Sequence, residues 1–223
     1  MKGTLIHKNN KSEKLSFNLI RDFMVFIILF YHLSSICQTV TDIDNNKYTT
    51  IKMGDQIWMS QNLNVTHFKN GDVIPEVINQ REWQEAWINK RPAWCNPNNI
   101  KNLTSTYGKL YNWYAVADPR GLAPSNYKIP NLLDWQKLID YFGNSGFIGY
   151  KISGTGFDFP RAGSRNILTS FSSYGESSKW WTSTESNEKS AWCVLIGEEW
   201  GPRLYDKCGI FGNGFSVKCL LEK

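Results

Sequence analysis

The longest helical pattern of the chain lies in residues 132–142. Pro130 and Asn131 come directly before it; Asn is a residue type favoured at a helix N-cap, and Gly143 is typical of a helix end. The apolar positions at helical spacing are Leu132, Leu133, Trp135, Leu138, Ile139 and Phe142. This pattern predicts an amphipathic helix that begins after Asn131 and ends at Gly143.

A shorter helix is predicted over residues 81–88. Trp83, Ala86 and Trp87 share one face of it, and its charged side chains lie on the other. The prolines of residues 92–97 end the pattern.

The first predicted strands flank a short turn. Residues 49–53 and 56–59 lie on either side of Gly54 and Asp55, a pair typical of the turn between antiparallel strands. We therefore predict a hairpin here.

Residues 42–47, DIDNNK, look like the start of a calcium loop. The EF-hand pattern requires Gly at its sixth position and Glu at its twelfth, where this chain has Lys47 and Met53. A hairpin turn through Asn45 and Asn46 is therefore the preferred interpretation, and we expect neither a metal nor another cofactor.

Residues 110–116 are apolar or aromatic at most positions, which favours a strand covered on both faces. Residues 156–159 and 170–172 are expected to be short apolar plugs in an irregular region. Further strands are predicted at 180–185, 191–196 and 215–221. Short antiparallel sheets, two or three helices and long irregular loops together predict an α+β domain.

Residues 1–37 differ in character from the rest. A basic stretch, an apolar run at residues 23–31 and small residues after it follow one another, as in a secretory signal peptide. The apolar run is shorter than the roughly 20 residues that a spanning helix needs. We therefore predict a signal peptide at 1–37 and a single domain at 38–223, in a secreted or cell-surface protein.

Two alternatives for the leader remain open. A signal anchor would stay in the membrane, and the long basic stretch keeps this interpretation in play. Lipidation of Cys37 would make the chain a lipoprotein, but Ile36 stands where lipidation signals usually have a small residue.

The charge of the chain lies largely in the leader. The whole chain has a net charge of +5, and residues 1–37 hold five of the 25 Lys and Arg and two of the 20 Asp and Glu, which leaves 20 against 18. No basic stripe remains, so we expect no nucleic-acid partner. Membrane contact is expected only through an uncleaved leader or a lipidated Cys37.

Four cysteines follow the leader. An even number in an exported chain favours two disulfides, and four cysteines allow three pairings. We prefer Cys193 with Cys208, which closes a hairpin-like loop, and Cys95 with Cys219, which ties the last strand to the body. Buried free thiols are the alternative.

Groups for catalysis are scarce. His67 is the only histidine after residue 37, so a Ser or Cys triad could be built only on this residue. Carboxylates for glycoside hydrolysis could come from Glu185, Glu198, Glu199 and Asp206, yet the neighbours Glu198 and Glu199 point to opposite faces of a strand. We expect no enzyme.

The ten tryptophans exceed what one core of this size usually takes up. Exposed Trp or Tyr beside Asn can stack on sugars or anchor a protein partner. Gly- and Pro-rich flanks place Trp94, Asn96, Trp200 and Tyr205 on loops, so these are the candidate ligand-binding residues. The alternative is that they are packed loop plugs.

Several stretches resemble one family in order along the chain. Residues 51–64, IKMGDQIWMSQNLN, look like the opening signature of the Fibrobacter succinogenes major paralogous domain (FISUMP), a module of exported bacterial proteins. Later signatures are matched by residues 107–115, 121–124, 180–183 and 215–219. The chain departs from the family at residues 125–128, SNYK, where a Gly-Trp-His step is usual.

A more distant likeness is to the formylglycine-generating-enzyme and C-type-lectin-like fold. Residues 129–135 are similar to a helix start of that group, and residues 214–217 to its last core strand. The resemblance implies terminal strands that meet at one edge and an irregular long-loop region. The copper-binding cysteine motif of the enzyme and the Glu-Pro-Asn and Trp-Asn-Asp motifs of the lectins are not found here.

The resemblance implies an exported binding or interaction module, with an extracellular glycan or protein as ligand. A purely structural surface protein without a specific ligand is the first alternative. A carboxylate-dependent glycoside hydrolase is the second.

Overall fold

The computed structural model describes residues 38–143, 155–197 and 203–222, without the side chains of residues 206–208. The residues from Gln38 onward group into one compact unit. Residues 1–37 lie outside the described part, so the signal peptide stays a prediction. None of the described helices is both long and apolar enough to cross a membrane.

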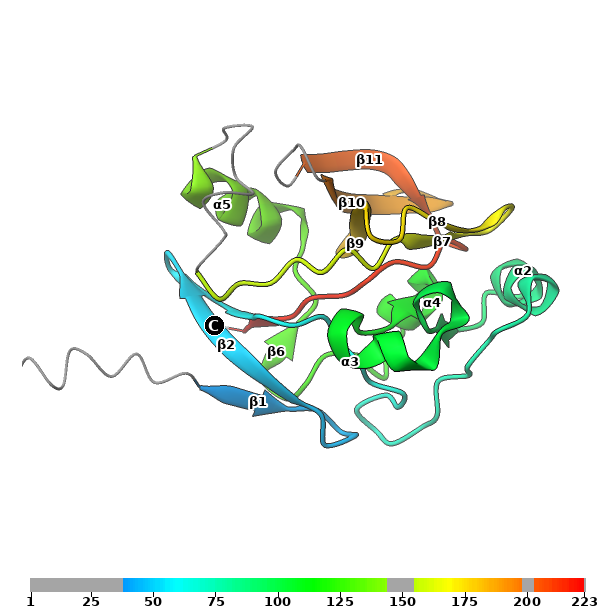
Figure 1. Ribbon diagram of the computed structural model, residues 1–223, viewed down its shortest axis with the longest axis horizontal. Helices are drawn as coiled ribbons and strands as arrows, with labels where there is room; N and C mark the ends of the chain where they lie inside the picture. Colours follow the sequence, from blue (N-terminus) through cyan, green and yellow to red (C-terminus); the bar gives the residue numbers. More distant parts are fainter. Residues whose placement is uncertain (1–37, 144–154, 198–202, 223) are drawn as a thin grey trace, which may run out of the picture. The chain divides into compact units, whose positions relative to one another are not determined.

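A five-stranded sheet joins the N-terminal hairpins to the C-terminal strand. Its strands, in spatial order, are β1 (Thr39–Thr41), β2 (Lys47–Met53), β3 (Gln56–Met59), β12 (Leu220–Leu221) and β6 (Tyr127–Lys128). Neighbouring strands are antiparallel, and the β2–β3 pairing confirms the predicted hairpin. Figure 1 shows the end of the chain beside β2. The first and last strands thus share one sheet, but β12 pairs with β3 and β6 and not with β1, so the expected meeting of the terminal strands at one edge is not observed.

A second sheet has three antiparallel strands in the order β11-β10-β9. Their bounds are β9 (Ser177–Asn187), β10 (Ser190–Gly197) and β11 (Arg203–Ile210). β9 and β10 confirm the strands predicted at 180–185 and 191–196. The sequence does not predict β11. In RLYDKCGI, apolar residues are followed by apolar ones and polar residues by polar ones, so the apolar and polar positions do not alternate as in a half-buried strand.

The other described strands form two small sheets. They consist of β4 (Trp94–Cys95) with β5 (Leu110–Tyr111), and β7 (Ser164–Asn166) with β8 (Ser170–Ser172). Phe157 is buried, which confirms the first predicted apolar plug. Phe171 is only partly buried against a core cluster and lies on the short strand β8, so the second is confirmed in part.

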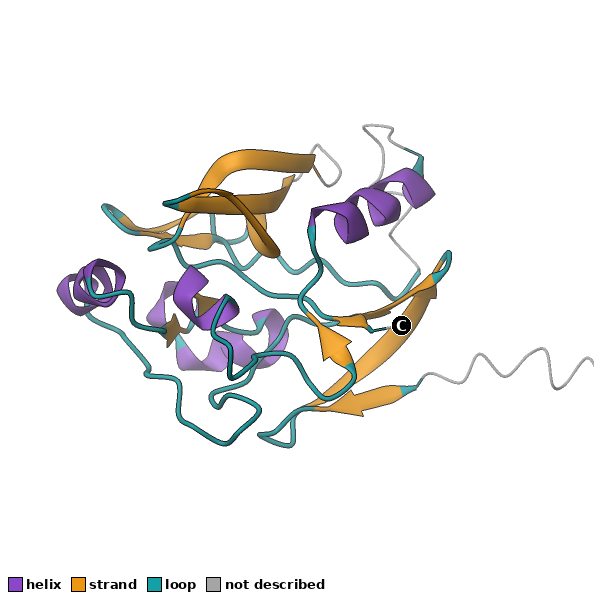
Figure 2. Cartoon of the chain, turned by 180° about the vertical axis from the view of Figure 1, so that it is seen from behind, coloured by secondary structure: helices purple, strands orange, loops and turns teal. Residues whose placement is uncertain are grey.

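The two predicted helices are observed as α2 (Gln80–Ile88) and α5 (Leu132–Phe142). In α5 the Asn131 side chain accepts from the Asp134 N–H at 2.9 Å, and the Asp134 carboxylate accepts from the Asn131 N–H at 3.0 Å. Gly143 ends the helix at a φ of 86°, which glycine adopts without steric cost. Seen from behind in Figure 2, α5 stands apart from the other α-helices.

The single strand predicted at 110–116 is wrong. β5 covers only its first two residues, and α4 (Trp113–Val116) follows at once. The cause is Asn112, whose side-chain oxygen accepts from the N–H of Ala93 and of Ala115 at 3.0 and 3.1 Å. All of these residues except the partly buried Tyr114 are buried, as expected, but an N-cap turns the chain into a helix.

The remaining helical segments are short. They are η1 (Pro97–Asn99), η2 (Lys101–Leu103) and α3 (Thr104–Tyr107). They carry the chain from β4 to β5.

The strand predicted at 215–221 is only partly observed, because β12 covers just its end. Phe215 exchanges two backbone hydrogen bonds with Tyr111, and Ser216 then bonds the backbone of Lys179 and Trp181. The segment therefore changes partner after one residue and forms no continuous ladder. In Figure 1 it runs in red from the β9–β11 sheet to the five-stranded sheet and connects them.

The tryptophans are used mainly in the core. Seven of those described are buried: Trp58, Trp83, Trp94, Trp113, Trp135, Trp180 and Trp181. The ring centroids of Trp58 and Trp135 lie 4.9 Å apart, and those of Trp113 and Trp181 lie 5.3 Å apart. The aromatic surplus is therefore largely core material.

The predicted Cys95–Cys219 disulfide is wrong in this structure. Both are free and buried thiols, and they lie in different apolar clusters. The Cys193–Cys208 bond stays a prediction, because the Cys208 side chain is not described. The strand register is compatible with it, since Cys193 pairs with Tyr205 and Ala191 with Gly209, which places residue 208 in the same bulged stretch.

Mixed α and β structure with several short antiparallel sheets is thus observed. The C-type-lectin-like assignment stays a prediction.

Candidate functional site

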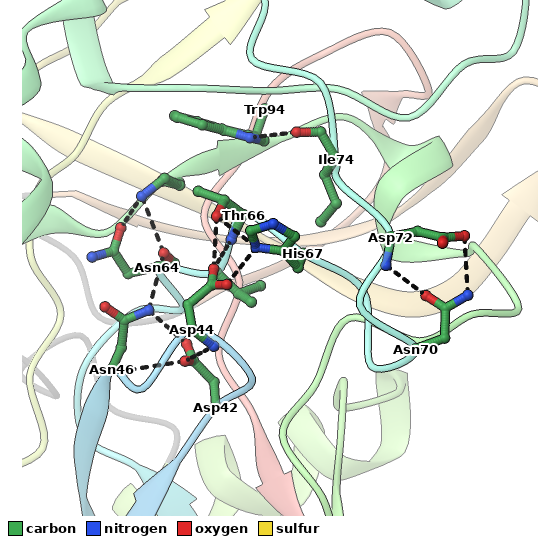
Figure 3. Close-up of polar contacts among 12 residues, drawn as sticks. Asp42, Asp44, Asn46, Asn64, Thr66, His67, Asn70, Asp72, Ile74 and Trp94 are labelled. Carbon is green, nitrogen blue, oxygen red and sulfur yellow. Dashed lines mark hydrogen bonds and ion pairs between the residues drawn. The ribbon is translucent and has the colours of Figure 1, made fainter.

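A cluster of hydrogen-bonded polar residues lies where the β1–β2 turn meets the segment after β3. We call Asp42, Asp44, Asn46, Asn64, Thr66 and His67 the Asp44 cluster (Figure 3).

Asp42 builds the turn itself. One carboxylate oxygen accepts from the N–H of Asp44 at 2.9 Å and of Asn46 at 3.0 Å. The other accepts from the Tyr48 hydroxyl at 2.6 Å and the Asn46 side chain at 2.8 Å. The run that looks like a calcium loop is therefore a hairpin turn, as predicted, with both oxygens of its first acid occupied.

Asp44 reaches from the turn to the neighbouring segment. Its carboxylate accepts from the backbone N–H and, at 2.8 Å, from the hydroxyl of Thr66, and Nδ1 of His67 lies 2.5 Å away. Burial by itself raises the pKa of Asp44, but the hydrogen bonds from Thr66 and His67 outweigh it and hold the pKa below its ordinary value. The pair thus fastens the hairpin to the segment after β3.

The geometry does not make His67 a catalytic base. Its ring is 37% exposed and uses Nδ1 for Asp44, an orientation that leaves Nε2 available. The nearest described hydroxyl, that of Thr66, lies 3.1 Å from Nδ1, on the Asp44 side. No described hydroxyl or thiol forms a hydrogen bond with Nε2, so the described residues do not assemble a triad on His67.

Lys109 adds a buried amine beside the cluster. Its Nζ donates to the backbone carbonyl of Asn64 at 3.0 Å and to the side-chain oxygen of the same residue. It also lies 4.6 Å from the centroid of the Trp94 ring. Burial lowers the pKa of Lys109 to about 8, although the carboxylates of Asp44 and Glu76 act in the other direction.

The predicted ligand-binding residues do not form one site. Trp94 is 7% exposed and donates its ring N–H to the Ile74 carbonyl at 2.8 Å. Asn96 is also buried, with its side chain bonded to Glu76 and Thr104. The expected exposure of these two residues is wrong. Gly- and Pro-rich flanks indicate that a residue lies on a loop, but they do not indicate whether its side chain packs into the core or faces solvent.

The other two candidates lie elsewhere. Tyr205 comes from β11 and is partly buried against the main core cluster. Trp200 lies outside the described residues. Ligand binding by these four residues stays a prediction.

Of the four carboxylates considered for glycoside hydrolysis, only Glu185 has a described side chain. Glu185 is exposed on β9. Glu198 and Glu199 lie outside the described residues, as does the Asp206 side chain. The described part of the chain also contains no group of three or more His, Cys, Asp or Glu that could hold a metal ion.

A small cleft lies beside the Asp44 cluster. Its volume is ≈ 190 Å³, and its lining residues are Thr41, Asp42, Ile43, Lys69, Leu122, Ala123, Pro124 and Ser125. Ile43 is 49% exposed, and the Lys69 side chain is exposed. The sequence does not reveal this cleft, because its walls come from residues 41–43, Lys69 and residues 122–125, three places spread over about 80 residues of the chain.

The departure from the family pattern at residues 125–128 adjoins this cleft, which Ser125 helps to line. Asn126 adopts a φ of 63°, a conformation that Asn tolerates better than most non-glycine residues. Tyr127 is buried, and Lys128 forms an ion pair of 2.8 Å with Asp134 of α5. A lysine therefore stands near the place where the family usually has a histidine, and it supports a helix start.

The comparisons with known proteins place the chain by family. The model of one protein family, described as "Fibrobacter succinogenes major domain", matches residues 51–220. No curated protein matches the chain. No solved structure matches it either.

Proposed function

The chain belongs to the Fibrobacter succinogenes major domain family, and from this premise we propose that it is an exported module that binds an extracellular glycan or protein. Export rests on the basic, apolar and small-residue order of residues 1–37. Binding without bond cleavage rests on the site, where the acids and the histidine are engaged with one another.

The cleft beside the Asp44 cluster carries this proposal. Ile43, Leu122 and Pro124 supply an apolar wall, while the exposed Lys69 supplies a polar group. Such a mixture suits a sugar ring, which has an apolar face and a polar rim, and it also suits a single amino-acid side chain.

The size of the cleft limits the ligand. A volume of ≈ 190 Å³ is below the roughly 300 Å³ at which small-molecule pockets begin. The cleft would therefore hold one unit of a polymer, a single sugar or a single side chain, with the rest of the ligand lying across the surface.

A polysaccharide and protein array with the purified full chain tests the proposal. We expect at least one polymer to bind, and Lys69→Ala together with Ile43→Ser to weaken this binding about tenfold or more. Lys137→Ala is the matched control, because Lys137 is an exposed lysine on α5 that does not line the cleft. Binding that survives both cleft changes would place the site elsewhere.

A purely structural surface protein is the second candidate. The observation in its favour is the burial of Trp94 and Asn96, which removes two expected anchors from the surface. This function predicts that no polymer on the array binds and that the cleft variants behave as the parent chain does.

A further inference from the structure

Lys109 and Asn64 meet in a contact that the proposed binding function does not use. Lys109 stands just before β5 and is 7% exposed, while Asn64 follows β3. The Nζ of Lys109 donates to both oxygens of Asn64, the backbone carbonyl at 3.0 Å and the side-chain Oδ1. Within the described residues these two oxygens are its hydrogen-bond partners.

We propose that Lys109 and Asn64 form an intramolecular isopeptide bond between Nζ and Cγ. Because Cγ lies one C=O bond beyond the Oδ1 that Nζ contacts, the nitrogen is within about 4 Å of the carbon that it attacks. Productive approach of two reacting atoms begins at roughly 3–3.5 Å, so only a small movement separates the observed contact from reaction.

The surroundings make the amine a nucleophile. Burial lowers the pKa of Lys109 to about 8, so about a tenth of the amine is neutral at pH 7 and has a free electron pair. The Trp94 ring, 4.6 Å from Nζ, covers the amine. The carboxylates of Asp44 and Glu76 act on it electrostatically and favour the positive charge that the nitrogen carries in the tetrahedral intermediate, before its proton passes to Nδ2.

The reaction balances without an oxidant or a cofactor. The neutral Nζ attacks Cγ of Asn64, one proton passes from Nζ to Nδ2, and the Cγ–Nδ2 bond breaks. Ammonia leaves and an amide joins the two side chains. Nδ2 makes no hydrogen bond to any described residue and is not among the described buried atoms without a partner. It is therefore open to solvent, and the ammonia has an exit.

The bond would fasten the segment after β3 to the start of β5 and close a covalent loop between positions that are 45 residues apart in the sequence. Such a cross-link reduces the conformational freedom of the unfolded chain as a disulfide does. Unlike a disulfide, it does not depend on redox conditions. Its presence is independent of whether the cleft binds a polymer.

Mass spectrometry of the full chain tests the bond directly. The protein is reduced, denatured and analysed intact, after its N-terminus has been mapped. We expect the mass to fall short of the sequence by one molecule of ammonia, and a protease digest to contain a branched peptide joined at residues 64 and 109.

Variants separate this modification from other losses of ammonia. Lys109→Arg keeps the charge but cannot form the bond, so it should have the full mass of its sequence, as should Asn64→Ala. Asn64→Asp should still form the bond and lose water instead. A parent chain that shows its full mass, with Lys109 and Asn64 in separate linear peptides even after incubation at alkaline pH, overturns the proposal whatever the variants do.

Discussion

Lys218 places an amine at a fully buried position with aromatic walls. Its Nζ donates to the Ser60 carbonyl and lies 4.8 Å from the centroid of the Phe157 ring and 5.5 Å from that of Phe159. Burial lowers the pKa of Lys218 to about 7, and Asp158 offsets only part of this effect. The charged form is thus poorly accommodated in the folded protein.

This position makes stability depend on pH in a defined window. Between about pH 7, the folded pKa, and about 10.5, the unfolded one, the unfolded chain binds more protons, so stability rises with pH. We predict that Lys218→Met flattens this rise, because the variant buries no amine. Relative to the parent it should be more stable at the acid end of the window, and less stable at the alkaline end, where the neutral amine still bonds Ser60.

Urea unfolding at a series of pH values measures the effect, which should be on the order of a few kcal/mol across the window. Lys52→Met is the matched control, since Lys52 is exposed on β2. Lys179 also has a lowered pKa and leaves a smaller rise in the variant. A parent chain whose stability is constant across the window would contradict this account of Lys218.

For the candidate site, the sequence predicts which residue types are present but not which of them are in contact. His67 is recognisable as the one histidine after the leader, but its partner Asp44 lies 23 residues away, and no local pattern joins them. The same holds for Lys109 and Asn64, which only the packing of β5 against the segment after β3 brings together. Residue types can be read from the chain, whereas their contacts need the fold.

At the scale of elements, local signals decide what the sequence can predict. α5 has its cap, its apolar face and its terminal glycine within a dozen residues, so the prediction is confirmed. α4 depends instead on Asn112, whose side chain also bonds the Ala93 N–H and the Arg91 carbonyl, 19 and 21 residues earlier. A helix cap whose partners are distant in the sequence produces no local pattern from which the helix could be predicted.

We therefore predict that replacing the two cap asparagines by alanine lowers the free energy of unfolding by different amounts. Asn112 is 1% exposed, and Asn112→Ala leaves the Ala93 N–H and the Arg91 carbonyl without their partner, so we expect a loss of roughly 2–4 kcal/mol. Asn131 is only partly buried and caps α5 alone, so Asn131→Ala should cost about 1 kcal/mol. Urea unfolding of both variants measures the difference. Equal losses would show that the distant bonds of Asn112 add nothing to its cap.

At the scale of the whole molecule, the C-terminal segment holds the sheets together and carries Cys219 into the main core cluster. Cys95 lies in another cluster, beside Trp83 and Ala93. The number of cysteines in the sequence favours a bond between these two thiols, but the number contains no information about the separate clusters in which they are buried. The fold explains their survival as thiols, since burial raises the pKa of Cys95 to about 11 and that of Cys219 further.

Alkylation tests this arrangement. In the folded chain without reductant, we expect iodoacetamide to leave Cys95 and Cys219 unmodified, because a buried thiol with a raised pKa offers neither thiolate nor access. In denaturant, again without reductant, both should be alkylated in full, as peptide mapping can show. A Cys95→Ala variant should leave the alkylation of Cys219 unchanged in both states. A peptide that links residues 95 and 219, or a Cys219 that reacts only after reduction, would mean that the C-terminal segment is tied to the body by a covalent bond and not by packing alone.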